Sequence, residues 1–135
     1  MIDHIGMSVR DIARASEFYR KALAPLGIGV VMEVSAEDTG HGAAIGFGAN
    51  WKPFFWIGEG PAGNQHIHVA FAAASRETVD AFYAAAIAAG GKDNGPPGLR
   101  PRYHENYYAA FVLDADGNNI EAVCHSPASA QAATR

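Results

Sequence analysis

Two stretches, HIGMSVRDIARASEFY at residues 4–19 and HVAFAAASRETVDAFY at residues 68–83, decide the fold. Each begins with an alternating apolar pattern typical of a strand and continues with helical spacing. In both, a histidine precedes a Phe-Tyr pair by the same number of residues, and an alanine follows at matching positions, Ala22 and Ala86. This shared register indicates an internal duplication with a period of about 60 residues.

Working outward, each copy predicts the same order of elements. The first half predicts a strand at residues 2–9, a helix from Asp11 to about residue 24, and strands at residues 29–34, 43–48 and 53–57. The second half predicts a strand at residues 66–72, a helix at residues 78–89 with Ser75 as its N-cap, and strands at residues 107–113 and 119–125. Residues 95–98 are expected to be a Pro/Gly loop, followed by a further strand within residues 99–105.

Size and composition restrict the class of protein. The chain has 135 residues, 49% of them apolar, a net charge of −4 and one cysteine, Cys124. The acidic balance argues against nucleic acid as a partner, and no apolar run approaches the ~18 residues that a membrane span needs. Since no signal peptide is recognisable, we expect a cytoplasmic protein without a disulfide.

Three side chains stand out as candidates for chemistry. Strand alternation places His4 and His68 on faces otherwise lined with small residues, which leaves room for a ligand. Glu121 lies in a mostly apolar strand, and a buried carboxylate is costly unless it is paired or binds a metal. The alternatives are histidines hydrogen bonded to local groups and a hairpin-edge carboxylate in water.

The motifs DHIGMSV at residues 3–9, HVAF at residues 68–71 and DADGNNIE at residues 114–121 resemble the vicinal oxygen chelate superfamily. This group includes glyoxalases, bleomycin and fosfomycin resistance proteins and extradiol dioxygenases. The resemblance spans residues 2–125. It implies an α+β fold in which two βαβββ modules form an open, curved mixed β-sheet with helices on its outer face. The modules would be residues 1–57 and 66–125, joined by a linker at residues 58–65 and followed by a flexible tail at residues 126–135.

The resemblance also implies a metal site. Carried over residue by residue, the ligands are His4, His68 and Glu121, with Glu121 also a candidate catalytic residue. The fourth ligand position of glyoxalase I falls on Phe55 or Trp56, and neither can bind a metal. Two histidines and one carboxylate suit a divalent Zn, Fe, Mn or Ni ion and leave coordination positions for water and substrate.

A pocket could be walled by polar and aromatic residues outside this ligand set. The stretch RPRYHENYY at residues 100–108 is polar and aromatic, and an aromatic run precedes the linker. The alternatives are an exposed loop for the first and core packing for the second. The pocket candidates are Trp56, Arg100, Tyr103, His104 and Tyr107.

These features predict a small metal-dependent enzyme, a lyase, isomerase or dioxygenase, that chelates a small oxygen-bearing substrate. A metal-free ligand-binding protein like the bleomycin resistance members is the first alternative, and a fosfomycin-type thiol transferase is the second. Because His4 belongs to the first module and the other two ligands to the second, a site must join two modules, which could come from one chain or from two. The resemblance favours a homodimer that shares its sites between chains.

Overall fold

The first module of the computed structural model is a sheet covered by one long helix. The structure describes residues 1–61 and 66–128. The module contains β1 (Ile5–Val9), α1 (Ile12–Leu23), the 3₁₀ turn η1 (Ala24–Leu26), β2 (Gly29–Val34), α2 (Ala36–Thr39), β3 (Ala44–Ala49) and β4 (Lys52–Glu59). Asp11 caps α1, because its side chain accepts a hydrogen bond from the backbone N–H of Arg14. Gly27 ends the turn in the left-handed conformation that glycine adopts without strain.

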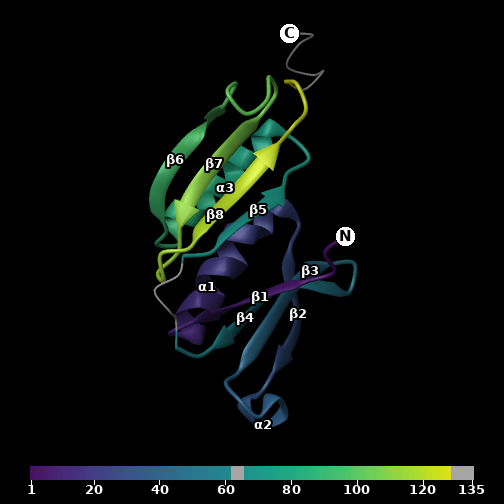
Figure 1. Ribbon diagram of the computed structural model, residues 1–135, viewed down its shortest axis with the longest axis vertical. Coiled ribbons are helices and arrows are strands. Elements are labelled where there is room, and N and C mark those ends of the chain that lie inside the picture. Colours follow the sequence, from purple (N-terminus) through teal and green to yellow (C-terminus); the bar gives the residue numbers. More distant parts are fainter. Residues whose placement is uncertain (62–65, 129–135) are drawn as a thin grey trace.

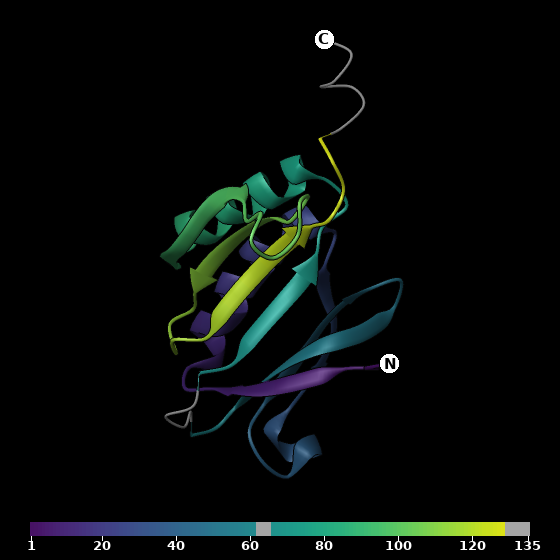
Figure 2. The same cartoon turned by 45° about the horizontal axis from the view of Figure 1, so that its top comes forward.

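The second module repeats this arrangement (Figure 1). It contains β5 (His68–Ala72), α3 (Arg76–Ala88), β6 (Lys92–Leu99), β7 (Tyr108–Leu113) and β8 (Asn119–Cys124). Ser75 caps α3, as its position before the helical pattern predicted. Figure 2 shows the green and yellow strands of this module above the strands of the first.

Each module forms its own mixed four-stranded sheet. The strand orders are β1-β4-β3-β2 and β5-β8-β7-β6, so the two halves have the same topology. In each sheet the first strand pairs in parallel with the last, and the remaining pairs are antiparallel. The predicted α+β fold with two βαβββ modules is confirmed, and within one chain it consists of two separate open sheets.

Two local predictions in the second module were wrong. Residues 95–98 lie within β6 and are not a loop, and the strand expected within residues 99–105 is replaced by turns. Two prolines fit in β6 because it is an edge strand of its sheet, where a missing N–H breaks no essential pairing. Its register against β7 also shifts between Asp93 and Gly95 and again before Gly98. In the first module, the short helix α2 was not predicted.

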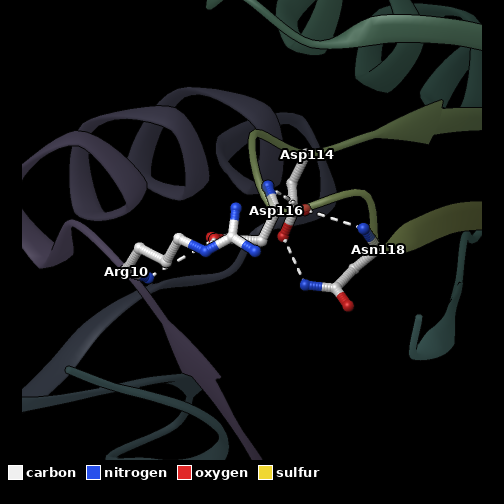
Figure 3. Close-up of polar contacts among 4 residues, drawn as sticks. All are labelled: Arg10, Asp114, Asp116 and Asn118. Atoms are coloured by element: carbon white, nitrogen blue, oxygen red, sulfur yellow. Dashed lines mark hydrogen bonds and ion pairs between the residues drawn. The ribbon is translucent and has the colours of Figure 1, made fainter. Parts of the chain in front are cut away.

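The modules meet through their helices and through the turn between β7 and β8. Helix α1 packs against α3, and the buried Tyr19 of α1 donates a hydrogen bond to Oδ2 of Asp114 at 2.5 Å. Asp114 also accepts hydrogen bonds from the side-chain amide of Asn118 at 3.0 Å and from the backbone N–H of Asn118 at 2.8 Å. Beside this turn, the backbone N–H of Arg10 donates to Asp116 at 3.4 Å (Figure 3). The turn that leads into β8 is therefore anchored to the first module.

The predicted linker and the predicted tail are each described only in part. Strand β4 continues to Glu59, so the linker expected at residues 58–65 begins inside a strand. Residues 62–65 and 129–135, where the rest of the linker and most of the tail were expected, lie outside the described residues. Among the helices of the described part of the chain, none is long and apolar enough to span a membrane.

Candidate functional site

The carboxylate of Glu121 lies on the open face of the second sheet. In β8, Ile120 and Ala122 point toward the helix and pack in the core, so Glu121 points the other way. Its neighbours across the strands are Ala70 in β5 and Phe111 in β7. Glu121 is nevertheless only 1% exposed. The site is therefore built around a buried acidic group on a sheet face that no helix of the described residues covers.

Both oxygens of this carboxylate have a partner. His68 Nε2 lies 2.8 Å from Oε1, and the Tyr107 hydroxyl donates a short hydrogen bond to Oε2. Burial, and after it the hydrogen bond to Glu121, raises the pKa of Tyr107 to about 12. Tyr107 is thus a protonated donor at neutral pH. The side chain of His68 is 53% exposed, so the group opens to solvent on the imidazole side.

Aromatic rings surround Tyr107. The ring of Tyr103 meets it edge-on at a centroid distance of 5.1 Å, and His125 does the same at 5.2 Å. The ring of His104 lies 5.8 Å from that of His125. Three of the predicted pocket residues, Tyr103, His104 and Tyr107, therefore gather beside Glu121.

Arg100 belongs to the same neighbourhood. Its guanidinium donates to the backbone oxygens of Gly98 at 2.7 Å and Pro96 at 2.8 Å, and it lies 5.4 Å from the centre of the Phe111 ring. Phe111 in turn lies 6.3 Å from the ring of His68. Phe111, which the sequence did not single out, thus lies between Arg100 and the imidazole. Its place opposite Glu121 depends on the pairing of two strands, which no single motif reveals.

The remaining candidates, His4 and Trp56, lie in the first module. His4 Nδ1 is 2.7 Å from a carboxylate oxygen of Asp3, and the same oxygen accepts a hydrogen bond from Lys52 at 2.6 Å. The hydrogen bond from Lys52, and then that from His4, lowers the pKa of the exposed Asp3. His4 is exposed on the open side of the first sheet, next to a cavity of about 510 Å³ that Lys52 and Trp56 also line.

The structure therefore divides the predicted site between the modules. Among residues 1–61 and 66–128, no group of three or more histidine, cysteine or acidic side chains gathers closely enough to hold a metal ion. His68 and Glu121 meet, whereas His4 is hydrogen bonded elsewhere. The second module offers a buried carboxylate, an imidazole and a phenol, which together could bind a cation or exchange protons with a ligand.

Similarity to solved structures extends over nearly the whole chain. A glyoxalase/bleomycin resistance protein from Albidiferax ferrireducens is 33% identical, with a TM-score of 0.74 over 94% of this chain and 99% of that one. The fosfomycin resistance protein FosX from Listeria monocytogenes, solved as a mutant with Mn(II) and 1S,2S-dihydroxypropylphosphonic acid, is 18% identical, with a TM-score of 0.66 over 91% and 88% of the two chains. A mutant of glyoxalase I from Zea mays is 24% identical, with a TM-score of 0.67 over 90% of this chain and 46% of that one.

Sequence comparison agrees with this similarity of fold. A search of curated proteins finds no match. The model of one protein family, described as the Glyoxalase/Bleomycin resistance protein/Dioxygenase superfamily, matches residues 1–122. The repeated βαβββ modules, the solved relatives and this match agree, and the chain belongs to the Glyoxalase/Bleomycin resistance protein/Dioxygenase superfamily.

Proposed function

We propose that this protein is a small metal-dependent enzyme, a lyase, isomerase or dioxygenase, that acts on a small substrate with two neighbouring oxygens. A divalent ion would be held by His68 and Glu121 of one chain and by His4 of a second. The observation that carries the proposal is the carboxylate of Glu121, only 1% exposed, with an imidazole nitrogen 2.8 Å from one oxygen. Burying a carboxylate is costly, and metal binding is a common reason for keeping one.

The donor atoms present fit such an ion. Imidazole nitrogen together with carboxylate oxygen suits Zn, Mn, Fe or Ni. His68 and Glu121 already point at each other, so an ion could take the place of the proton between them. The Tyr107 hydroxyl would remain on the other carboxylate oxygen and fix its orientation, as an outer partner of a metal ligand does.

A second chain is proposed because one chain keeps its candidate donors apart. Within a chain, the modules are joined by the contact of α1 with α3 and by the bond from Tyr19 to Asp114. His4 and the pair formed by His68 and Glu121 lie in different sheets. A symmetric homodimer would bring the first module of each chain to the second module of the other and complete two identical sites.

The chemistry follows from charge. When bound, the ion would polarise two substrate oxygens and stabilise the negative charge of an enolate or oxyanion. The Tyr107 hydroxyl, with a pKa of about 12, stays protonated and keeps its single hydrogen bond to Glu121, which holds the carboxylate in place for the ion. Phe111 and Tyr103 limit the access of water to the carboxylate from the side of β7. The main role of Glu121 would be to bind the metal ion.

The first test is the metal content of protein purified without an affinity tag, supplemented with zinc or manganese and then dialysed. Wild type should retain about one ion per chain, and His4→Ala, His68→Ala and Glu121→Ala should each lose most of it. His41→Ala is the matched control, because it removes an exposed histidine from outside the site. Wild type without metal would contradict the proposal and favour the metal-free binding protein. A His41→Ala variant that loses metal as the others do would also contradict it, because the ion would then not be held specifically by the three proposed ligands.

A mixing experiment tests the sharing of sites. His4→Ala and Glu121→Ala are unfolded together, refolded at equal input, and assayed for bound metal. In a cross-chain dimer, half the dimers are mixed, and each mixed dimer has one site with both lesions and one with neither. Bound metal should then return to roughly a quarter of wild type if pairing is random and sites are independent. If each site came from one chain, every site would keep a lesion, and bound metal would stay at the level of the separate variants.

A further inference from the structure

Trp56 is the structural counterpart of Glu121. In the first sheet, β1 and β4 run in parallel and Gly6 is paired with Trp56. In the second sheet, β5 and β8 run in parallel and Ala70 is paired with Glu121. Gly6 and Ala70 both lie two residues after the duplicated histidine, so the two pairs are equivalent. The register therefore decides between the two candidates that the sequence left open for the missing fourth ligand position.

The residue that is paired with this position on the neighbouring antiparallel strand also differs between the two modules. Gly46 of β3 is paired with Trp56, whereas Phe111 of β7 is paired with Glu121. A Cβ atom at Gly46 would lie 2.9 Å from Cζ2 and Cη2 of Trp56 and also 2.9 Å from Cβ of Pro53, which is closer than such contacts allow. The indole and the Pro53 ring therefore occupy the space that a side chain at position 46 would need. Where one module has a phenylalanine beside an acid, the other has a glycine beside an indole.

The indole is open to solvent on the face where a substrate would lie. Trp56 is partly exposed and lines two cavities, one of about 510 Å³ with His4 and Lys52 and one of about 500 Å³ with Ser8 and Asn118. Gly6 and Ala44 are small residues beside it, and the exposed Met32 lies on the same face, because it is paired with Gly46. Trp56 is thus a large, partly exposed apolar side chain that borders one cavity together with His4 and a second cavity together with Ser8.

We propose that Trp56 determines specificity by stacking on a planar, aromatic or conjugated group of the substrate. The inference rests on the proposed function, because a substrate at an ion held by His4, His68 and Glu121 would meet the residue at the fourth, equivalent position. An indole cannot ligate that ion, but its face offers a flat apolar contact that favours offset stacking with another ring. Saturated groups of the same size would fill the space without this preference.

The test uses the fact that the chain has only two tryptophans. Trp51 is 93% exposed, so Trp51→Phe leaves Trp56 as the sole tryptophan reporter of binding by fluorescence. The probes are benzohydroxamic acid and cyclohexanecarbohydroxamic acid, which share a metal-chelating head and differ in ring planarity, added to zinc-loaded protein. The planar probe should quench Trp56 and bind roughly fivefold more tightly, as expected for one stacked ring pair.

Variants and a second probe pair make the outcome decisive. By calorimetry, Trp56→Leu should bind both hydroxamates equally, Trp56→Phe should keep most of the preference, and Trp51→Leu should keep all of it. Benzamide and cyclohexanecarboxamide, which lack the chelating head, are compared on metal-free protein. If no metal is retained and the hydroxamates bind no better than the amides, the proposed function fails, while the amide pair still tests stacking.

Three results would overturn the inference about Trp56: no planar preference in either pair, a preference that survives in Trp56→Leu, or conversion of a dimer to a monomer by Trp56→Leu. The last would assign the indole to contact between chains. Gly46→Ala provides an independent check that keeps the tryptophan, because the added methyl group would press on both the indole and Pro53. It should reduce the planar preference in the same direction as Trp56→Leu.

Discussion

Replacing Tyr19 by phenylalanine tests the buried contact between the modules. The hydroxyl donates to Oδ2 of Asp114 at 2.5 Å, Tyr19 is fully buried, and burial raises its pKa well above the ordinary value, so it remains a donor. Tyr19→Phe leaves that oxygen with only the Asn118 amide at 3.0 Å. Hydrogen bonds to charged groups contribute about 1.5–3 kcal/mol, so we expect the free energy of unfolding to fall by about 2 kcal/mol.

For a chain of this length, that loss corresponds to a decrease in Tm of roughly 6–10 °C. The assay is urea unfolding followed by circular dichroism, with calorimetry for Tm. Tyr108→Phe is the matched control, because its hydroxyl donates to Asp80 at 2.6 Å in an exposed bond. We expect it to cost less than about 0.5 kcal/mol. The reasoning is refuted if the two variants differ by less than the error of the measurement.

Three further predictions concern the site and the core. The pKa of Tyr107 is raised to about 12, so the stability that this group contributes below pH 10 is lost as the pH rises toward 12. Tyr107→Phe should therefore make the pH dependence of the free energy of unfolding shallower in that window. An unchanged slope would contradict the assignment. Cys124 is 1% exposed, so its thiol should react with a disulfide reagent only as fast as the protein opens, and fast labelling of native protein would show that β8 is not packed as described. Zinc should raise the Tm of wild type but not of Glu121→Ala, and an equal shift in both would locate the ion elsewhere.

The sequence could predict the elements because each half carries strong periodicity and clear caps. Residues 29–34 were predicted with both ends correct, Asp11 was predicted to begin the first helix and is its N-cap, and Ser75 was identified as the N-cap of the second. The failure at β6 came from Gly and Pro, which indicate a loop locally but are tolerated in an edge strand. Edge position is a property of the assembled sheet, so no local pattern could reveal it.

The candidate site, like the secondary structure, was predicted from the sequence only in part. Strand alternation placed His68 on a face of small residues, the family resemblance put it in one ligand set with Glu121, and the structure shows the two side chains in contact. The partner on the second oxygen, Tyr107, was expected only to line a pocket, because its reach toward Glu121 depends on the turns before β7. The separation of His4 from this pair depends on how the helices of the two modules pack, which strand patterns do not encode.

The paired exchange between Gly46 with Trp56 and Phe111 with Glu121 has a consequence for the history and the redesign of the two halves. In the first half the large aromatic side chain of the pair lies on β4, and in the second half it lies on β7, so exchanging one member alone changes the volume without compensation at the other. Trp56→Glu alone would restore an acid but leave it over an unfilled glycine, whereas Gly46→Phe alone would collide with the indole. The double change would pair an acid with a phenylalanine as in the second half, and the phenylalanine would also have to displace Pro53. After duplication, the halves could therefore diverge in chemistry while keeping one backbone, and a return to symmetry must cross a destabilised intermediate.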